Sequence, residues 1–242
     1  MKRRQFIKAT TLSTLTLATL PNFAFAKNTI SVQELIGKGK PKLYGNGYAL
    51  REAAHLAFLK MKTEALKEGI HIQPVSSYRS FNHQKSIWQR KYKRYKSEGF
   101  TETQSIQKII NYSTIPGTSR HHWATDIDII DANVPAPKNV LREENFHNNG
   151  AYVTLKKWMD THANAFGFYL VYTNDADRKG FKYEPWHYSY KPLSQNFLNA
   201  YKKINIQEIL KKEQLLGNEY LTQAFLETYL KENILDINPQ LL

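Results

Sequence analysis

The segment that runs from Ser119 to Asp128 constrains this chain most, because it places metal-binding side chains where a loop turns into an apolar run. It reads SRHHWATDID, so that His121 and Asp128 lie seven positions apart. A later segment reads YEPWH, with Glu184 three residues before His187. Two histidines and one aspartate can hold a zinc ion and leave a fourth position open. A glutamate beside such an ion is the base that metal-assisted hydrolysis needs. The two segments therefore predict a metal site, and the fold must bring them together.

The choice of ligands stays open on spacing alone. The chain has no cysteine, so any metal must be held by histidine and carboxylate side chains. His122 is as available as its neighbour His121, and Asp126 competes with Asp128. A histidine followed by an aspartate at this distance also occurs often by chance.

The hydrophobic pattern predicts helices and short strands interspersed along the chain. Helices are expected over residues 48–68, 80–97, 101–112 and 152–166, and strands over 70–75, 125–130, 168–172 and 186–190. The first helix rests on apolar residues at helical spacing, namely Leu50, Ala54, Leu56, Leu59, Met61 and Leu66. Ser80 is the expected N-cap of the second helix. Residues 194–242 read as mostly helical, most clearly over 204–212 and 218–231. This order favours an α+β fold with a mainly antiparallel sheet and helices packed on it.

The chain carries a formal net charge of +13, which suits an anionic partner such as a cell-wall polymer. The expected helix over 80–97 interleaves lysines and arginines with Trp88, Tyr92 and Tyr95. Such a face can hold nucleic acid or anionic glycan. A solvated helix with its aromatic residues on the core side is the preferred interpretation, and nucleic acid is not expected as a partner.

The first 26 residues have the layout of an export signal. A basic start that includes Arg3 and Arg4 precedes an uncharged stretch and an Ala-Phe-Ala cleavage site. The arginine pair is typical of a twin-arginine signal. The apolar stretch is too short for a membrane span. We therefore expect an exported protein of the periplasm or cell envelope, with the domain that holds the metal over 27–192 and a helical extension over 193–242 packed on it.

Three motifs together resemble the VanY-type D-alanyl-D-alanine carboxypeptidases, which are zinc metallopeptidases of the M15 family. They are SSYRS from Ser76 to Ser80 with Gln84 after it, the segment from Ser119 to Asp128, and EPWH from Glu184. The family pattern is SGYRS followed by Q, then SxHxxGxAxD, then ExWH. The resemblance covers residues 49–191 and implies the LAS/hedgehog-like metallopeptidase core.

The resemblance also implies roles for individual residues. His121, Asp128 and His187 become the ligands of one Zn2+ ion, and Glu184 becomes the base that activates the water on that ion. Arg79 becomes the cation for the oxyanion or for the terminal carboxylate of the substrate. The remaining implied substrate or site-shaping contacts are Ser119, Gln84, Tyr78 and Trp186.

Three residues depart from the family pattern. Ser77 and Ala124 replace glycines, and Asp126 stands where a small alanine is expected. Replacing glycine by alanine is harmless unless φ is positive at that position. Asp126 adds negative charge near the metal and could tune it or hold one of its ligands.

The resemblance implies zinc-dependent hydrolysis of the terminal D-Ala-D-Ala bond of peptidoglycan stem peptides. An L,D-carboxypeptidase or a peptidoglycan endopeptidase with the same site is the alternative, and a non-catalytic wall-binding module is a further one. The sequence does not determine the oligomeric state or the role of residues 193–242.

Overall fold

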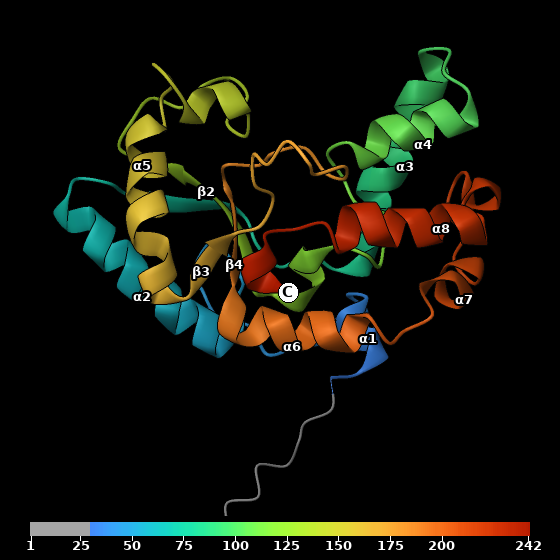
Figure 1. The fold of residues 1–242 in the computed structure, drawn as a ribbon, viewed down its shortest axis with the longest axis horizontal. Helices are drawn as coiled ribbons and strands as arrows, with labels where there is room; N and C mark the ends of the chain where they lie inside the picture. The colour runs from blue at the N-terminus through green and yellow to red at the C-terminus, as the bar shows by residue number, and fades with distance from the viewer. Residues whose placement is uncertain (1–29) are drawn as a thin grey trace, which may run out of the picture.

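A computed structural model describes residues 30–242 (Figure 1). The expected export signal over residues 1–26 lies outside the described residues. A four-stranded antiparallel sheet with the order β1-β2-β4-β3 forms the centre of the fold. Its strands are β1 (Ile72–Ser76), β2 (Asp126–Asp131), β3 (Phe168–Leu170) and β4 (His187–Tyr190). The expected α+β class with an antiparallel sheet is confirmed. Pro74 is tolerated because β1 is an edge strand with a bulge between Pro74 and Ser76.

Strand β2 is buried along its whole length, although half of its residues are aspartates. Because side chains alternate along a strand, Ile127 and Ile129 face one side of the sheet while Asp126 and Asp128 face the other. The register pairs Asp128 with His187 and Asp126 with Ser189 on β4. The sheet thus carries an apolar face and a face of buried polar groups.

The apolar face is covered by α2 (Glu52–Lys67) and α5 (Val153–His162), which lie on the left in Figure 1. The core side of α2 consists of Ala54, Phe58, Met61 and Ala65. The three leucines that helped to predict this helix are exposed instead, namely Leu56, Leu59 and Leu66. The helix also begins later than expected, because Leu50 forms an isolated β-bridge with Tyr44.

A second hydrophobic core lies on the other side of the sheet, on the right in Figure 1. Its helices are α1 (Val32–Leu35), α3 (Phe81–Ser97), α4 (Glu102–Ile110), α6 (Lys191–Tyr201), α7 (Ile206–Lys211) and α8 (Gln223–Tyr229). The Ser80 side chain caps α3 by accepting a hydrogen bond from His83 N. Trp88 and Tyr92 of α3 are buried in this core, as the solvated-helix interpretation expects.

The C-terminal region departs from the expected elements in two places. Helix α6 starts at Lys191 with Pro192 in its first turn, where a proline costs no backbone hydrogen bond. The helix expected over 218–231 is divided into a 3-10 turn, α8 and a π-helical turn (Leu230–Ile234). The break before α8 occurs at Thr222, whose side chain caps α8 by accepting from Phe225 N.

Two tyrosines of the C-terminal region hold the loop that leads to His121. The Tyr229 hydroxyl accepts a hydrogen bond from Ile115 N at 3.2 Å and lies 2.9 Å from Thr118 Oγ1. The Tyr201 hydroxyl donates to the carbonyl of Gly117 at 3.0 Å. The backbone of this loop is therefore fixed from residues that follow the last strand.

Replacing Tyr229 with phenylalanine is expected to lower the free energy of unfolding by about 1–3 kcal/mol, because it leaves the buried amide of Ile115 without its acceptor and removes one of the two hydrogen bonds of Thr118 Oγ1. Urea denaturation of the wild type and the variant measures this difference. Tyr220→Phe is the matched control, because Tyr220 is 40% exposed. Equal stability of the two variants would show that these hydrogen bonds do not hold the loop.

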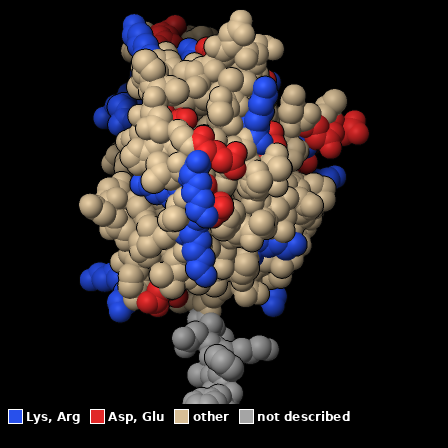
Figure 2. Space-filling view, turned by 90° about the vertical axis from the view of Figure 1, so that its left-hand side faces the viewer, with Lys and Arg blue, Asp and Glu red and all other residues tan. Residues whose placement is uncertain are grey.

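Within residues 30–242, no helix has the length and apolar character needed to cross a bilayer. Figure 2 shows the side of the molecule on which α2 and α5 lie. Lysine and arginine side chains on that face alternate with acidic and uncharged ones, so the positive net charge does not gather there as one patch.

Candidate metal centre and active site

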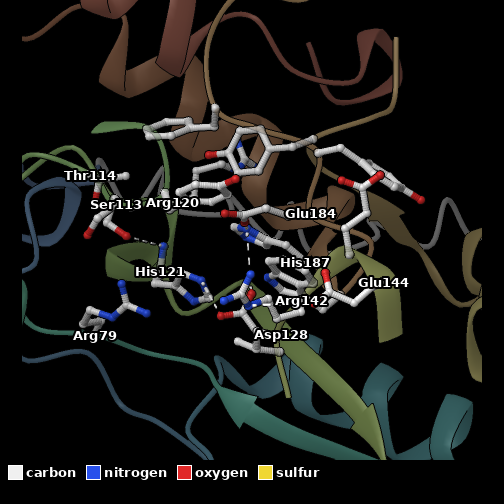
Figure 3. A pocket seen from close by; sticks show the side chains of 18 residues that line it. Arg79, Ser113, Thr114, Arg120, His121, Asp128, Arg142, Glu144, Glu184 and His187 are labelled. Atoms are coloured by element: carbon white, nitrogen blue, oxygen red, sulfur yellow. Dashed lines mark hydrogen bonds and ion pairs between the residues drawn. The ribbon is translucent and has the colours of Figure 1, made fainter. Parts of the chain in front are cut away.

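A cavity of about 530 Å³ opens beside the polar face of the sheet (Figure 3). Its wall includes the three predicted metal ligands together with Arg79 and Glu184. His121 comes from a 3-10 helix (Arg120–Trp123) that Ser119 caps by accepting from His121 N. His187 and Asp128 come from adjacent strands. A volume of this size is typical of a small-molecule or peptide site.

The predicted ligands converge in the structure. One ligand atom from each of His121, Asp128 and His187 lies within 4.8 Å of the others, and all three residues are buried. His121 Nε2 is 3.4 Å from Asp128 Oδ2, and His187 Nδ1 is 3.9 Å from Asp128 Oδ1. The two imidazole rings are stacked with their centroids 4.7 Å apart. Figure 3 shows these side chains pointing toward one another.

The far side of each imidazole has a hydrogen-bond acceptor. His121 Nδ1 donates to the Ser77 carbonyl at 2.8 Å, which leaves Nε2 as the lone-pair nitrogen that faces Asp128. His187 Nε2 lies 3.0 Å from Asp126 Oδ2, and its Nδ1 faces the cavity. Asp128 Oδ1 is among the buried oxygens of the described residues that have no hydrogen-bond partner. Two imidazole nitrogens and an unsatisfied carboxylate oxygen are a donor set that fits zinc.

The site concentrates negative charge around His187. Burial alone raises the pKa of Asp128, but the histidines beside it and Arg79 hold that pKa below its usual value. Burial alone lowers the pKa of His187, whereas its hydrogen bonds with Asp126 and Glu184 raise it to about 10. The carboxylates around His187 therefore favour a positive charge in this part of the cavity.

The rival ligands lie elsewhere. His122 Nε2 accepts from Gly117 N at 3.1 Å, so its Nδ1 donates to the carbonyl of Arg79. Burial lowers the pKa of His122 to about 3, which keeps the ring neutral. Asp126 binds Arg120 and Ser189 in addition to His187. Neither residue belongs to the converging set, and His122 instead fixes the backbone that carries Arg79.

Glu184 lies beside His187 because the chain turns between them. His187 N donates to Glu184 O at 3.0 Å, and β4 begins only at His187. Glu184 Oε2 comes within 3.1 Å of His187 Nδ1. A regular strand would have placed these two side chains on opposite faces. Pro185, which lies between them, is consistent with the turn.

Arg79 is oriented by two side chains. Its Nη1 donates to Gln84 Oε1 at 2.8 Å, and its Nη2 donates to Ser76 Oγ at 2.9 Å. Burial lowers the pKa of Arg79, while Asp128 and Glu184 act in the opposite direction. Gln84 is itself fixed by donating to the carbonyl of Thr114 at 2.7 Å.

The implied substrate contacts divide into two groups. Ser119 and Trp186 line the cavity, whereas Gln84 and Tyr78 are not part of its wall. Gln84 is fully buried and holds Arg79 in place.

Two features of the site were missed in the sequence. The first is the pair Arg120 and Ser189, which are the partners of Asp126. A carboxylate inside a buried strand needs a cation and hydrogen-bond donors, so Asp126 itself was the signal in the sequence that such partners exist. Arg142 lines the cavity from the long connection after β2, a length that often indicates a functional loop.

Ala124 occupies a left-handed backbone conformation with φ of 57°. Its replacement of the family glycine therefore falls at a position where alanine is strained, at a cost of about 1–2 kcal/mol.

Comparison with known proteins gives a consistent picture. A family model described as "VanY: D-alanyl-D-alanine carboxypeptidase" matches residues 47–193. The chain is 26% identical over 151 residues to a D-alanyl-D-alanine carboxypeptidase of Enterococcus faecalis, an alignment that covers 62% of this chain and 51% of the relative. It is 29% identical over 119 residues to an uncharacterized protein of Haemophilus influenzae, covering 47% and 91% of the two chains. The chain thus spans about half the length of the Enterococcus relative.

Two solved structures share the fold. VanYB in complex with D-alanine-D-alanine superposes with a TM-score of 0.52 at 22% identity, covering 73% of this chain and 92% of that one. A mutant of the vancomycin-resistance D,D-pentapeptidase VanY in complex with Zn(II) gives a TM-score of 0.50 at 23% identity, covering 76% and 89%. The family match extends over more than half of the sequence and contains all three motifs. This chain belongs to the VanY family of D-alanyl-D-alanine carboxypeptidases.

Proposed function

We propose that this protein is a zinc-dependent peptidase that removes the terminal D-alanine from peptidoglycan stem peptides. The observation that carries the proposal is that His121, Asp128 and His187 converge in one cavity with Glu184 and Arg79. Membership of the VanY family supports the reaction class, and a solved relative of the same fold contains Zn(II).

One zinc ion would be held by His121 Nε2, Asp128 and His187 Nδ1. When bound, zinc supplies a Lewis acid that activates water and polarises the scissile carbonyl. The protein prepares this donor set by giving the far nitrogen of each histidine an acceptor.

Glu184 is the proposed general base. Its carboxylate lies 3.1 Å from the ligand nitrogen of His187, so it borders the metal position without belonging to the converging set. It takes a proton from the attacking water and delivers that proton to the leaving amine of D-alanine. One carboxylate thus serves both proton transfers.

Arg79 is the proposed electrophilic partner. Its guanidinium is oriented by hydrogen bonds to Gln84 and Ser76, and its backbone carbonyl accepts a hydrogen bond from His122. A fixed cation at the cavity wall stabilises the negative charge that develops on the carbonyl oxygen, or binds the terminal carboxylate of the substrate. Ser119 and Trp186 complete the proposed wall for the peptide.

The test is a digest of defined muropeptides by the protein without residues 1–26. Pentapeptides, tetrapeptides and cross-linked dimers are incubated with added zinc or with a chelator, and the products are identified by mass spectrometry. Zinc-dependent release of D-alanine from the pentapeptide is expected. Release from the tetrapeptide alone would assign an L,D-carboxypeptidase, and cleavage of the dimer would assign an endopeptidase. If no substrate is cut with zinc present, the protein is not this enzyme.

We further propose that residues 1–26 direct export to the periplasm or cell envelope by the twin-arginine route, and that 27–192 and 193–242 act as one peptidase unit. Replacing Arg3 and Arg4 together with lysine is expected to keep the protein in the cytoplasm, because the route depends on the arginine pair. Cell fractionation and immunoblotting measure the distribution. Undiminished export of the variant would assign an ordinary secretory signal.

A further inference from the structure

We propose that Asp126 is a positioning residue that fixes the orientation of His187, so that His187 presents Nδ1 to the metal. This inference rests on the proposed zinc function and adds to it a residue outside the ligand set. Asp126 stands at a position where the family motif has a small residue, so the contact between Asp126 and His187 is a feature of this chain and not of the shared motif.

The sheet register creates the arrangement. Asp126 and Asp128 project from the same face of β2, and β4 carries His187 opposite Asp128. The imidazole of His187 consequently lies between two carboxylates. Its Nδ1 is 3.9 Å from Asp128 Oδ1, and its Nε2 is 3.0 Å from Asp126 Oδ2. The metal side and the Asp126 side are opposite edges of one ring.

Asp126 is itself held by three other donors. Arg120 Nε donates to Oδ2 at 2.9 Å, and the hydroxyls of Ser189 and Thr125 each donate to Oδ1 at 2.7 Å. Asp126 is fully buried, and Arg120 is 2% exposed. Arg120 Nη2 also donates to Ser189 Oγ at 2.7 Å, which closes the network. The carboxylate therefore has a fixed position before any metal arrives.

A fixed carboxylate decides which nitrogen of His187 is free to bind metal. A carboxylate only accepts hydrogen bonds, so the nitrogen that faces Asp126 must carry a proton. Nδ1 also has an acceptor, because Glu184 Oε2 lies 3.1 Å from it on the cavity side. With Asp126 in place, the proton of the neutral ring can stay on Nε2 and leave the Nδ1 lone pair free for a metal. Without Asp126, the carboxylate that still accepts from the ring is Glu184, so the proton is drawn to Nδ1 and blocks coordination. Loss of such a partner typically weakens metal binding about 10–100-fold.

A plain structural ion pair between Arg120 and Asp126 is the competing explanation. It accounts for the buried charges but not for the contact of Oδ2 with the His187 nitrogen that lies away from the metal. The two explanations differ in what happens to zinc affinity when both charges are removed together.

The first experiment compares zinc dissociation constants, measured by competition with a chromogenic chelator at one pH. The double variant Asp126→Ala with Arg120→Leu removes the acceptor without leaving a buried charge unpaired. It is expected to bind zinc about 10–100-fold more weakly than the wild type while the metal-free protein melts cooperatively. Ser189→Ala is the matched control, because it removes a donor to Asp126 and does not contact His187 in the network. It is expected to bind zinc as the wild type does.

The second experiment needs no variant and covers the case in which the double variant does not fold. In the zinc-loaded wild type labelled with 15N-histidine, the His187 proton is expected on Nε2, with a hydrogen-bonded downfield resonance. A proton on Nδ1 would overturn the proposal, and so would a folded double variant with wild-type zinc affinity. A wild type that binds zinc and cuts no muropeptide would instead refute the proposed function and leave the role of Asp126 intact.

Discussion

A Glu184→Gln protein is expected to bind one zinc ion per chain and to release D-alanine about 10²–10⁴ times more slowly than the wild type. Glutamine has nearly the shape of glutamate but cannot take a proton from water. Because Glu184 does not belong to the converging ligand set, the metal content should survive the change. The rate is measured by coupled detection of D-alanine, and the zinc content by atomic spectrometry.

Glu219→Gln is the matched control for this prediction, since Glu219 is exposed and lies outside the cavity wall. It should keep the activity of the wild type. If Glu184→Gln remains fully active with zinc bound, Glu184 is not the base and another group must take the proton.

Replacing Arg79 with methionine is expected to lower kcat/KM by about 10²–10³, because the cavity loses its fixed cation. Methionine keeps a similar length and fills the space, but it donates no hydrogen bond to the substrate. Steady-state kinetics on the pentapeptide measure the effect. The exposed Arg90 of α3 provides the control, since Arg90→Met removes a positive charge away from the site.

The same kinetics distinguish the two roles of Arg79. If the guanidinium stabilises the transition-state oxyanion, kcat falls and KM changes little. If it binds the terminal carboxylate in the ground state, KM rises and kcat changes little. An unchanged kcat/KM would remove Arg79 from the site altogether. Arg79→Lys should not restore activity fully, because a single ammonium cannot reproduce the forked contacts with Gln84 and Ser76.

The site could be predicted from the sequence because both the residue types that bind metal and their spacing in the motifs pointed to it. The motifs identified His121, Asp128 and His187 as ligand candidates. What spacing could not decide was the choice between His121 and His122. That choice depends on backbone partners, since one ring turns toward Asp128 and the other toward Gly117 N.

The fold was predictable to the level of class and element order. The side of α2 that faces the core could not be predicted, because the apolar residues of this helix form two stripes with the same helical period. The stripe of Ala54, Phe58, Met61 and Ala65 packs on the sheet, and the larger leucines remain at the surface. Periodicity reports that a helix has an apolar side, but tertiary packing selects which side is buried.

The hydrophobic pattern also did not predict that the C-terminal region holds the loop that leads to His121. Tyr201 and Tyr229 read as ordinary helical residues, and their hydroxyls find partners only when the chain returns to the loop that contains Gly117 and Thr118. Contacts between residues 84 and 111 positions apart leave no periodic trace in a single sequence.

The contacts of Tyr229 mean that the site residues are synthesised before the residue that fixes their loop. A ribosome produces His121, Asp128, Glu184 and His187 well before it reaches Tyr229. Until then, the loop that leads to the first ligand lacks two of its hydrogen bonds. A nascent chain therefore lacks a complete site until its last helices have folded. If the protein leaves the cell interior already folded, its metal centre is completed before transport.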